Sequence, residues 1–380
     1  MLTKISQRGR RSASSVFCIK GVALMLGELF GRGKKSFNVT VEPFGKTLSV
    51  GKRETILQAA LRSGLAYPSE CRAGACASCK TQLVDGSIKP LTDFAYVLDV
   101  DDIKSGTFLA CQSLAKSDLT IRVDSLRDGL KPIKPNVFGG EISKLNYLTH
   151  DIQEVIVSLD GEMDYYAGQY ANLTVPGITE SRSYSFASAP EVKSNTVVKF
   201  YIRMVPGGEV SAWLASGECL GKAIQVEGPF GIFGMRESLS PIVCIAGGSG
   251  MAPILSILEQ GVLNKVDRPL VYLYGARTQA DLYSESLIFD ISKCWNSSFR
   301  FIPVLSEEPD ESDWDGARGL VTDHIKQIDD FDLQGAQAYL CGPPPMIDAA
   351  IPILNNCGVR GRDIFYDKFI DRSHSPEMLS

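Results

Sequence analysis

The chain has 380 residues, 44% of them hydrophobic and 22% charged, and a formal net charge of −5 at pH 7. This length predicts two or three domains, and the composition excludes a disordered or fibrous protein. The acidic balance disfavours nucleic acid as a partner, because phosphate binding needs a basic surface. Ten cysteines are too few for a disulfide scaffold, so we expect a cytoplasmic protein.

Residues 1–36 differ from the rest of the chain. They are rich in Lys and Arg with a single acid, Glu28, and Lys20 and Glu28 interrupt the apolar stretch from Val16 to Phe30. No small-residue cleavage site follows, which disfavours a secretory signal. Two interpretations stay open: a disordered or mis-started leader with the true start at Met25, and a basic amphipathic segment that contacts anionic lipid at the membrane surface.

Residues 37–127 predict a small domain of strands and one helix. "FNVTVEPFGKTLSV" (37–50) alternates around a turn and predicts two strands. "ETILQAALRSG" (54–64) predicts a short helix that ends at Gly64, with inward-facing residues Ile56, Leu57, Ala60 and Leu61. "KTQLVDGSI" (80–88) predicts a strand that enters an Asp-Gly turn, and "DLTIRVDSL" (118–126) closes the unit. The Pro, Gly and Lys residues of 128–137 are typical of a linker.

The pattern of apolar and polar residues after this linker differs between two regions. Residues 138–236 contain short, alternating, turn-rich segments, which predict a small antiparallel barrel. Residues 237–380 contain continuous apolar strands that alternate with helices, beginning with "PIVCIAGGSG" (241–250) and "MAPILSILEQG" (251–261). This alternation predicts a parallel sheet with helices on both faces.

Three cysteines lie within nine positions, at Cys71, Cys76 and Cys79, and Cys111 follows at a distance. A disulfide knot fits poorly in a chain that has no secretory signal and enough residues to bury a core. Structural zinc sites take their ligands as two close pairs, whereas C-x₄-C-x₂-C…C is the spacing of plant-type [2Fe–2S] proteins. Gly74 and its small neighbours leave room for backbone N–H groups near the cluster. Most of the remaining cysteines are expected to be small core residues: Cys18, Cys219, Cys244, Cys294, Cys341 and Cys357.

Two segments of the barrel region suggest a site for a phosphorylated ring compound. "RSYSFAS" (182–188) alone fits the exposed face of a strand equally well. In "VPGGEVSAWL" (205–214), however, two glycines precede an expected helix start at Ser211, where backbone N–H groups can approach a phosphate. Arg182 can pair with the same pyrophosphate, Tyr184 can stack on a ring, and Ser185 can reach a ring nitrogen.

Three strand ends of the last region carry glycines. "IAGGSGMAP" (245–253) is a strand, a glycine loop and a helix start; Gly275 and Arg277 follow the next strand, and Cys341 and Gly342 end a third. Open parallel sheets bind ligands at the carboxyl ends of their strands. Cys341 is therefore either a buried core thiol or a contact for a bound ring.

The order of these motifs resembles the ferredoxin–NAD(P)⁺ reductase superfamily with an N-terminal plant-type ferredoxin domain. Over residues 37–370 the chain is similar to reductase components of xylene/toluene-type and phenol-type hydrocarbon monooxygenases. The resemblance implies an α+β β-grasp ferredoxin domain (37–127), a linker (128–137), an antiparallel β-barrel flavin domain (138–236) and an α/β parallel-sheet nucleotide-binding domain (237–380).

The resemblance also implies roles for single residues. Contacts to FAD are expected from Arg182, Ser183, Tyr184, Ser185, Gly207, Gly208 and Ser211. Contacts to the nicotinamide nucleotide are expected from Gly247, Gly248, Ser249, Gly250, Gly275, Arg277, Gly342, Pro343 and Met346. The cluster ligands are Cys71, Cys76, Cys79 and Cys111, and the catalytic contacts are Tyr184, Ser185 and Cys341. Near the C-terminus, Phe369 is expected to shield the flavin, with Tyr366 as its rival.

These implications predict an enzyme that passes electrons from NADH through FAD and the [2Fe–2S] cluster to a separate oxygenase component. NADH is favoured over NADPH because no dense basic set surrounds Arg277 and Glu285 is unhelpful to a 2′-phosphate. Hydride transfer needs no general acid or base, so no catalytic role falls to His150, His324 or His374.

Other hypotheses stay open at this point. The same cofactors could serve a ring-hydroxylating dioxygenase or a deoxysugar-biosynthesis dehydratase. A non-enzymatic iron–sulfur redox sensor is a third hypothesis. We expect a monomer that binds no nucleic acid, with peripheral membrane contact only if residues 1–36 supply it.

Overall fold

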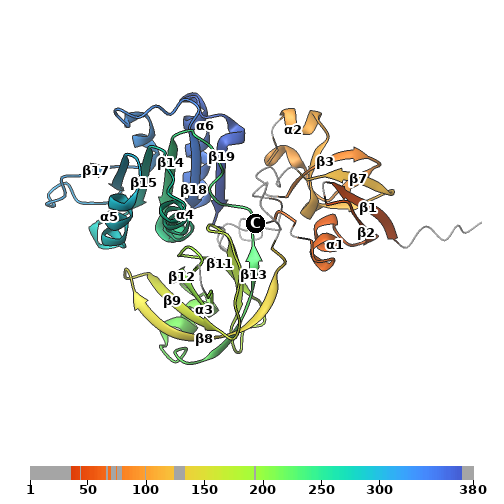
Figure 1. Cartoon of the computed structure of the whole chain (residues 1–380), viewed down its shortest axis with the longest axis horizontal. Helices are drawn as coiled ribbons and strands as arrows, with labels where there is room; N and C mark the ends of the chain where they lie inside the picture. The colour runs from red at the N-terminus through yellow and green to blue at the C-terminus, as the bar shows by residue number, and fades with distance from the viewer. Residues whose placement is uncertain are drawn as a thin grey trace, which may run out of the picture.

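Figure 1 shows the computed structural model of the chain, in which three domains follow one another. The structure describes residues 36–42, 44–65, 67–69, 74, 79–98, 100–123, 133–191 and 194–369. The expectations for residues 1–35 lie outside this part of the chain. Within it, no helix is both long enough and apolar enough to cross a membrane.

The first domain, red to orange in Figure 1, is built on a five-stranded mixed sheet. The sheet order is β2 (Lys46–Gly51), β1 (Ser36–Glu42), β7 (Leu119–Arg122), β3 (Lys80–Asp85) and β5 (Thr107–Leu109). β1 runs antiparallel to β2 and parallel to β7, which confirms the β-grasp expectation. The shorter strands β4 (Ile88–Pro90) and β6 (Ser113–Ala115) pair with each other, and α2 covers Val100–Lys104.

The predicted short helix of this domain is α1 (Ile56–Arg62). Thr55 caps it, because the Thr55 hydroxyl accepts the Gln58 N–H while the Gln58 side chain accepts the Thr55 N–H. The buried face holds Ile56, Leu57, Ala59 and Ala60. Leu61, expected to face inward, is only half-buried, because it packs at the edge of this core.

The second domain, yellow to green, is an antiparallel six-stranded sheet. Its order is β11 (Arg182–Ser185), β10 (Tyr170–Thr174), β13 (Ala223–Phe230), β8 (Asn136–Tyr147), β9 (Ile152–Leu159) and β12 (Val197–Arg203). A bridge between Phe186 and Phe200 joins the two edges, so the sheet nearly closes into the predicted barrel. β8 begins within the segment predicted as linker; the ends of the domains stay predictions.

The third domain is a parallel sheet in the order β17 (Ala317–Arg318), β16 (Phe299–Leu305), β15 (Leu270–Ala276), β14 (Ile242–Gly247), β18 (Gln337–Gly342) and β19 (Ile364–Lys368). Alternate residues of β14 enter two different cores: Cys244 lies with α4 (Met251–Leu263) and α5 (Glu285–Cys294), and Val243 lies with α6 (Pro344–Asn356). Helices therefore cover both faces, as predicted. The edge strands β17 and β19 were not expected from the sequence.

Three of the cysteines expected in the core are buried: Cys219, Cys244 and Cys341. Two others are not core residues: Cys294 is exposed at the end of α5, and Cys357 is half-buried just after α6. Cys18 lies outside the described residues.

Polar contacts fix the barrel against helix α4 of the third domain. The hydroxyl of Ser256, fully buried in α4, donates to the Ser188 carbonyl at 2.7 Å and accepts the Gly168 N–H at 3.3 Å. One turn further on, the Glu259 carboxylate accepts the Ala189 N–H at 2.8 Å. These contacts hold the barrel beside the face of the sheet that carries α4.

Replacing Glu259 by glutamine is expected to stabilise the protein at pH 8 by less than about 1 kcal/mol. Burial raises the pKa of Glu259, so folding disfavours its charge, and glutamine keeps an acceptor for Ala189 without that charge. The protonated form of Glu259 is the one that the fold favours. Its contribution to stability is fully present below the pKa of the unfolded chain and is lost as pH rises through the pKa of the folded protein. The advantage of glutamine should therefore vanish near pH 4.

Urea unfolding of wild type and variant at pH 4, 6 and 8 measures this difference. Glu191→Gln is the control, because Glu191 is exposed near the same interface. A Glu259→Gln protein that is less stable than wild type at pH 8 would contradict the prediction.

Candidate functional site

Two of the four predicted cluster cysteines belong to the described residues, and they emerge side by side. Cys79 directly precedes β3, and Cys111 follows the adjacent strand β5. The Ala110 N–H donates to the Cys79 carbonyl at 3.1 Å, and both cysteines are at most 5% exposed. Cys71 and Cys76 lie outside the described residues.

Gly74, which stands between Cys71 and Cys76 in the sequence, approaches this pair closely. Its φ is +83°, a left-handed conformation that favours glycine, and a Cβ there would stand 2.6 Å from the Gln112 side chain. Gln112 is the neighbour of Cys111. A buried pair of cysteines, with a glycine packed this closely against the neighbour of one of them, suits an iron–sulfur cluster.

The predicted flavin motif lies on β11, an edge strand of the barrel. Tyr184 is half-buried, and burial raises its pKa to about 12. The Ser183 hydroxyl donates to the Asn172 side chain on β10 at 2.7 Å. The Arg182 guanidinium is partly exposed, at 29%, and contacts Glu180 at 3.1 Å and Glu209 at 3.9 Å. The contact with Glu209 brings Arg182 to the start of helix α3 (Glu209–Ala215).

The glycine pair before α3 forms a tight turn. The Gly208 N–H donates to the Val205 carbonyl at 3.0 Å, with Pro206 and Gly207 between them. Gly207 has a φ of +73°, which, with proline before it, is the signature of a type II turn. No atom lies within 4 Å of where a Gly207 side chain would begin, so the turn is open to solvent on that side.

The predicted helix start at Ser211 was wrong by two residues. α3 begins at Glu209, with Gly208 as its N-cap residue. Ser211 lies in the first turn, where its hydroxyl accepts the Val205 N–H at 2.9 Å. This bond stabilises the turn, so Ser211 shapes the glycine loop whether or not it also contacts a ligand.

A tyrosine of the barrel connects the flavin motif to the cluster domain. The Tyr170 hydroxyl donates to the carbonyl of Ser69 at 3.0 Å, and Ser69 lies two residues before Cys71. Tyr170 is also the register partner of Ser185 across β10 and β11. The backbone that leads into the cysteine loop therefore touches the strand pair that carries the flavin motif.

The glycine loop of the third domain lies at the carboxyl ends of β14, β15 and β18. Gly247 is in register with Gly275, and its neighbour Ala246 is in register with Cys341. A Cβ at Gly250 would stand only 2.2 Å from the Cys341 carbonyl oxygen, so a side chain there would collide with backbone. Gly342, with a φ of +141°, also packs closely against the Gly247 backbone: a Cβ there would stand 2.9 Å from the Gly247 carbonyl oxygen.

Pro343 and Met346 complete this loop cluster. The Met346 sulfur lies 3.0 Å from where a Gly247 side chain would begin, and Pro343 lies at 3.4 Å. At Gly248, in contrast, a side chain would meet no atom within 4 Å, and its φ is +56°. Ser249 is half-buried beside it. The loop is thus packed tightly at Gly247 and Gly250 and open at Gly248. A nucleotide could bind against the exposed backbone of this open part.

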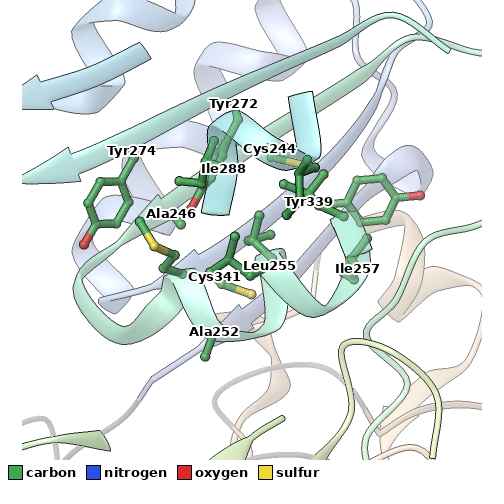
Figure 2. Close-up of a cluster of buried hydrophobic side chains, with 14 of the residues drawn as sticks. Cys244, Ala246, Ala252, Leu255, Ile257, Tyr272, Tyr274, Ile288, Tyr339 and Cys341 are labelled. Atoms are coloured by element: carbon green, nitrogen blue, oxygen red, sulfur yellow. The ribbon is translucent and has the colours of Figure 1, made fainter. Parts of the chain in front are cut away.

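Cys341 has a fully buried side chain in the core between the sheet and α4. Figure 2 shows it with Ala252 and Leu255 of that helix. It is also the register partner of Asp367 on β19, and the Ser185 hydroxyl of the barrel donates to the Asp367 carboxylate at 3.4 Å. Asp367 therefore lies next to both predicted residues: it pairs with Cys341 in the sheet, and its carboxylate accepts the Ser185 hydroxyl. The sequence analysis missed Asp367, although it stands in the quoted "FYDKF" segment.

The two candidates for the flavin shield lie differently. Tyr366 packs in the core on the α6 side, and its ring lies under the Lys368 ammonium group. Asp367, one residue on, faces Ser185 instead. Phe369 is half-buried, and its N–H donates to the Gly342 carbonyl at 2.9 Å, which holds it beside the glycine loop.

Arg277 is held by carboxylates from two domains. Its guanidinium donates to Asp281 at 2.7 Å and to Asp151, in the turn between β8 and β9 of the barrel, at 3.0 Å. Burial would raise the pKa of Asp151, but the Thr149 hydrogen bond and nearby Arg277 and Arg203 hold it below the usual value. The sequence analysis missed both carboxylates, because their proximity depends on how the domains pack.

Further acids lie beside Arg277. The Glu307 N–H donates to the Arg277 carbonyl at 2.8 Å, and its side chain is exposed at the carboxyl end of β16. The Glu308 carboxylate accepts the Gln279 N–H at 2.8 Å. His150 lies 3.4 Å from the Arg277 guanidinium, and His324 contacts the Arg318 carbonyl at 2.8 Å. His374 lies outside the described residues.

Each domain matches a known family. Residues 39–116 match the 2Fe-2S iron-sulfur cluster binding domain, residues 140–234 the oxidoreductase FAD-binding domain, and residues 244–351 the oxidoreductase NAD-binding domain. These matches confirm the three cofactor types and the oxidoreductase class that the sequence predicted.

Similar proteins extend over most of the chain. The xylene/toluene monooxygenase electron transfer component of Pseudomonas putida is 39% identical over 88% of this chain and 94% of its own length. The phenol 2-monooxygenase reductase component of Pseudomonas sp. strain CF600 is 37% identical, with the same coverage. Among solved structures, an Amycolatopsis cytochrome P450 reductase aligns with a TM-score of 0.71 and 29% identity, covering 88% of this chain and 98% of that one.

Proposed function

Because the chain belongs to the ferredoxin–NAD(P)⁺ reductase superfamily, among the reductase components of multicomponent oxygenases, we propose that it carries electrons from NADH to an oxygenase. The acceptor we propose is the oxygenase component of a hydrocarbon or aromatic monooxygenase. Bound FAD can take a hydride from a nicotinamide and release electrons singly, which suits a cluster that accepts one electron at a time.

The barrel residues bind and orient the flavin in this proposal. Arg182 lies close to the glycine turn before α3, and together they supply a positive charge and backbone N–H groups for the pyrophosphate. Tyr184 offers a half-buried aromatic face for the flavin ring. The Ser185 hydroxyl donates its proton to Asp367, so its oxygen is left to accept from a ring N–H.

The third domain presents the nicotinamide to that flavin. The glycine loop at 247–250 receives the nucleotide phosphates, and Cys341 and Gly342 lie at the adjacent strand end. We assign the flavin shield to Phe369, because Tyr366 packs on the opposite, α6 side of the sheet. In this position Phe369 would cover the flavin ring and exclude water from it.

We propose NADH rather than NADPH as the donor. Asp151 and Asp281 already neutralise Arg277, so little positive charge is left for a 2′-phosphate. The exposed Glu307 beside it would repel that phosphate. A carboxylate at a strand end also suits the 2′-hydroxyl of NADH.

Electrons leave through the ferredoxin domain, with Cys71, Cys76, Cys79 and Cys111 as the proposed ligands. The observation that carries this proposal is the Tyr170–Ser69 contact, since it links the backbone before Cys71 to the partner strand of Ser185. Such proximity of the cluster loop and the flavin motif is what electron transfer within one chain requires.

A dioxygenase is the second candidate acceptor. The 2-halobenzoate 1,2-dioxygenase electron transfer component of Burkholderia cepacia is 30% identical over 85% of this chain. It is less similar than the monooxygenase components, which favours a monooxygenase client. The FAD-binding and NAD-binding matches argue against the redox-sensor hypothesis.

Reconstitution tests the proposal. The purified protein, loaded with FAD and cluster, is mixed with a candidate monooxygenase or dioxygenase component, and NADH and NADPH oxidation are each measured with and without the oxygenase substrate. We expect substrate-dependent NADH oxidation with the monooxygenase and at least tenfold lower kcat/KM with NADPH. Equal kcat/KM values for NADH and NADPH would contradict the proposed donor. Substrate-dependent NADH oxidation with the dioxygenase alone would contradict the proposed acceptor.

A further inference from the structure

The carbonyl oxygen of Gly248, inside the glycine loop, accepts two tyrosine hydroxyls. Tyr283, which lies shortly before α5, donates at 2.8 Å, and Tyr274 of β15 donates at 3.3 Å. Both tyrosines are at most 5% exposed, and their rings meet edge to face at a centroid distance of 6.0 Å. The Met251 N–H, at the start of α4, donates to the same carbonyl. A carbonyl held by this backbone bond and by two buried hydroxyls has little freedom to rotate.

The direction of that carbonyl decides where the next N–H group points. In a trans peptide the C=O and N–H bonds point in opposite directions. With the Gly248 carbonyl directed at the tyrosines, the Ser249 N–H is directed away from them. A side chain at Gly248 would meet no atom within 4 Å, so the loop offers open space for an anion.

We propose that Tyr283, with help from Tyr274, is a positioning residue that aims the Ser249 N–H at the pyrophosphate of the nicotinamide nucleotide. This inference rests on the proposed function, because it assumes that the glycine loop receives the nucleotide. The tyrosines themselves do not touch the nucleotide; they act only through the Gly248 carbonyl.

Tyr283 is itself held by the flavin barrel. The Tyr201 ring of β12 meets the Tyr283 ring edge to face at 5.7 Å, and the Tyr201 hydroxyl lies 3.5 Å from the hydroxyl of Ser284. Ser284 has a φ of +57°, a left-handed conformation that is uncommon for a residue other than glycine. Barrel contacts at Tyr283 and its strained neighbour therefore help to orient the phosphate loop against the flavin domain.

The hydroxyl of Tyr283 can act as a donor at any pH at which the enzyme works. Burial raises its pKa well above the usual value for tyrosine, so the proton stays on the oxygen. The positioning effect should consequently be independent of pH between 6 and 9.

The test removes one hydroxyl at a time from the full-length, cofactor-loaded protein. For Tyr283→Phe we expect the Kd values of NADH and ADP-ribose, which both carry a pyrophosphate, to rise about 3–10-fold. For Tyr274→Phe we expect a smaller rise, because its bond is longer. We expect kcat at saturating NADH to stay within twofold and the Ki of adenosine, which has no phosphate, to stay unchanged.

Tyr272→Phe is the matched control. Tyr272 is fully buried in the same core, and among the described residues its hydroxyl has no hydrogen-bond partner. Removing that hydroxyl should leave every binding constant unchanged and leave the melting temperature equal or higher.

Two results would overturn the inference: an unchanged Kd of ADP-ribose in the Tyr274→Phe/Tyr283→Phe double variant, and an equal loss of adenosine and ADP-ribose binding. Failure of the wild-type protein to bind NADH would instead refute the proposed function. The wild-type measurement therefore separates the two claims.

Discussion

Replacing Cys111 by serine is expected to abolish the visible absorbance of the [2Fe–2S] cluster and electron delivery to the oxygenase, while NADH-driven reduction of ferricyanide persists. The cluster needs four thiolates, and Cys111 is one of two buried cysteines that adjacent strands bring together. Ferricyanide can take electrons from the flavin directly, so the barrel and the nucleotide domain should still work. Cys76→Ser is expected to behave in the same way.

Absorbance spectra, iron content and the two acceptor assays measure this outcome. Cys219→Ser is the matched control, because Cys219 is buried in the barrel core, where its thiol donates to the Leu214 carbonyl at 3.6 Å. Its cluster spectrum should be normal. Loss of ferricyanide reduction in Cys111→Ser would contradict a modular chain of cofactors.

The second large effect is expected from Gly250→Ala. A Cβ at this position would stand 2.2 Å from the Cys341 carbonyl oxygen and 2.8 Å from the Gly342 nitrogen, and both atoms are backbone that cannot rotate away. The glycine loop must then shift away from β18. We expect the NADH-dependent rate to fall at least ~100-fold, since catalysis depends on the position of the loop to within about 1 Å.

Chemical reduction separates this effect from general damage. Dithionite should still reduce the flavin and the cluster of Gly250→Ala, because both are bound by other domains. Gly361→Ala is the control, because a Cβ there would meet no atom within 4 Å. NADH turnover of Gly250→Ala within twofold of wild type would show that the loop tolerates displacement.

Local patterns in the sequence predicted the elements of this fold well. Alternation around a turn predicted β1 and β2, an apolar run followed by glycines predicted β14 and α4, and cysteine spacing predicted the cluster. Helix ends were less certain: α3 begins two residues before the predicted Ser211, because Gly208 caps it. The strand β19 was missed, since a short edge strand leaves only a weak pattern.

The contacts between distant segments could not be predicted in this way. Asp151 and Arg277 are more than one hundred residues apart, and only the packing of the barrel on the third domain brings their charges together. The same holds for Ser185 with Asp367, and for Tyr170 with the backbone before Cys71. Arg277, Ser185 and Cys71 stand in recognisable motifs, but their partners Asp151, Asp367 and Tyr170 do not stand out by spacing or by their neighbours in the sequence.

The sequence by itself determined which cofactors this protein is built to hold, because cysteine spacing and glycine motifs are local and survive as patterns along the chain. The tertiary structure alone decided how the sites are connected and tuned. The contacts that do this are hydrogen bonds of about 3 Å, made by Tyr283, Asp367 and the acids around Arg277. Such distances are set by the packing of whole domains, which no local pattern encodes.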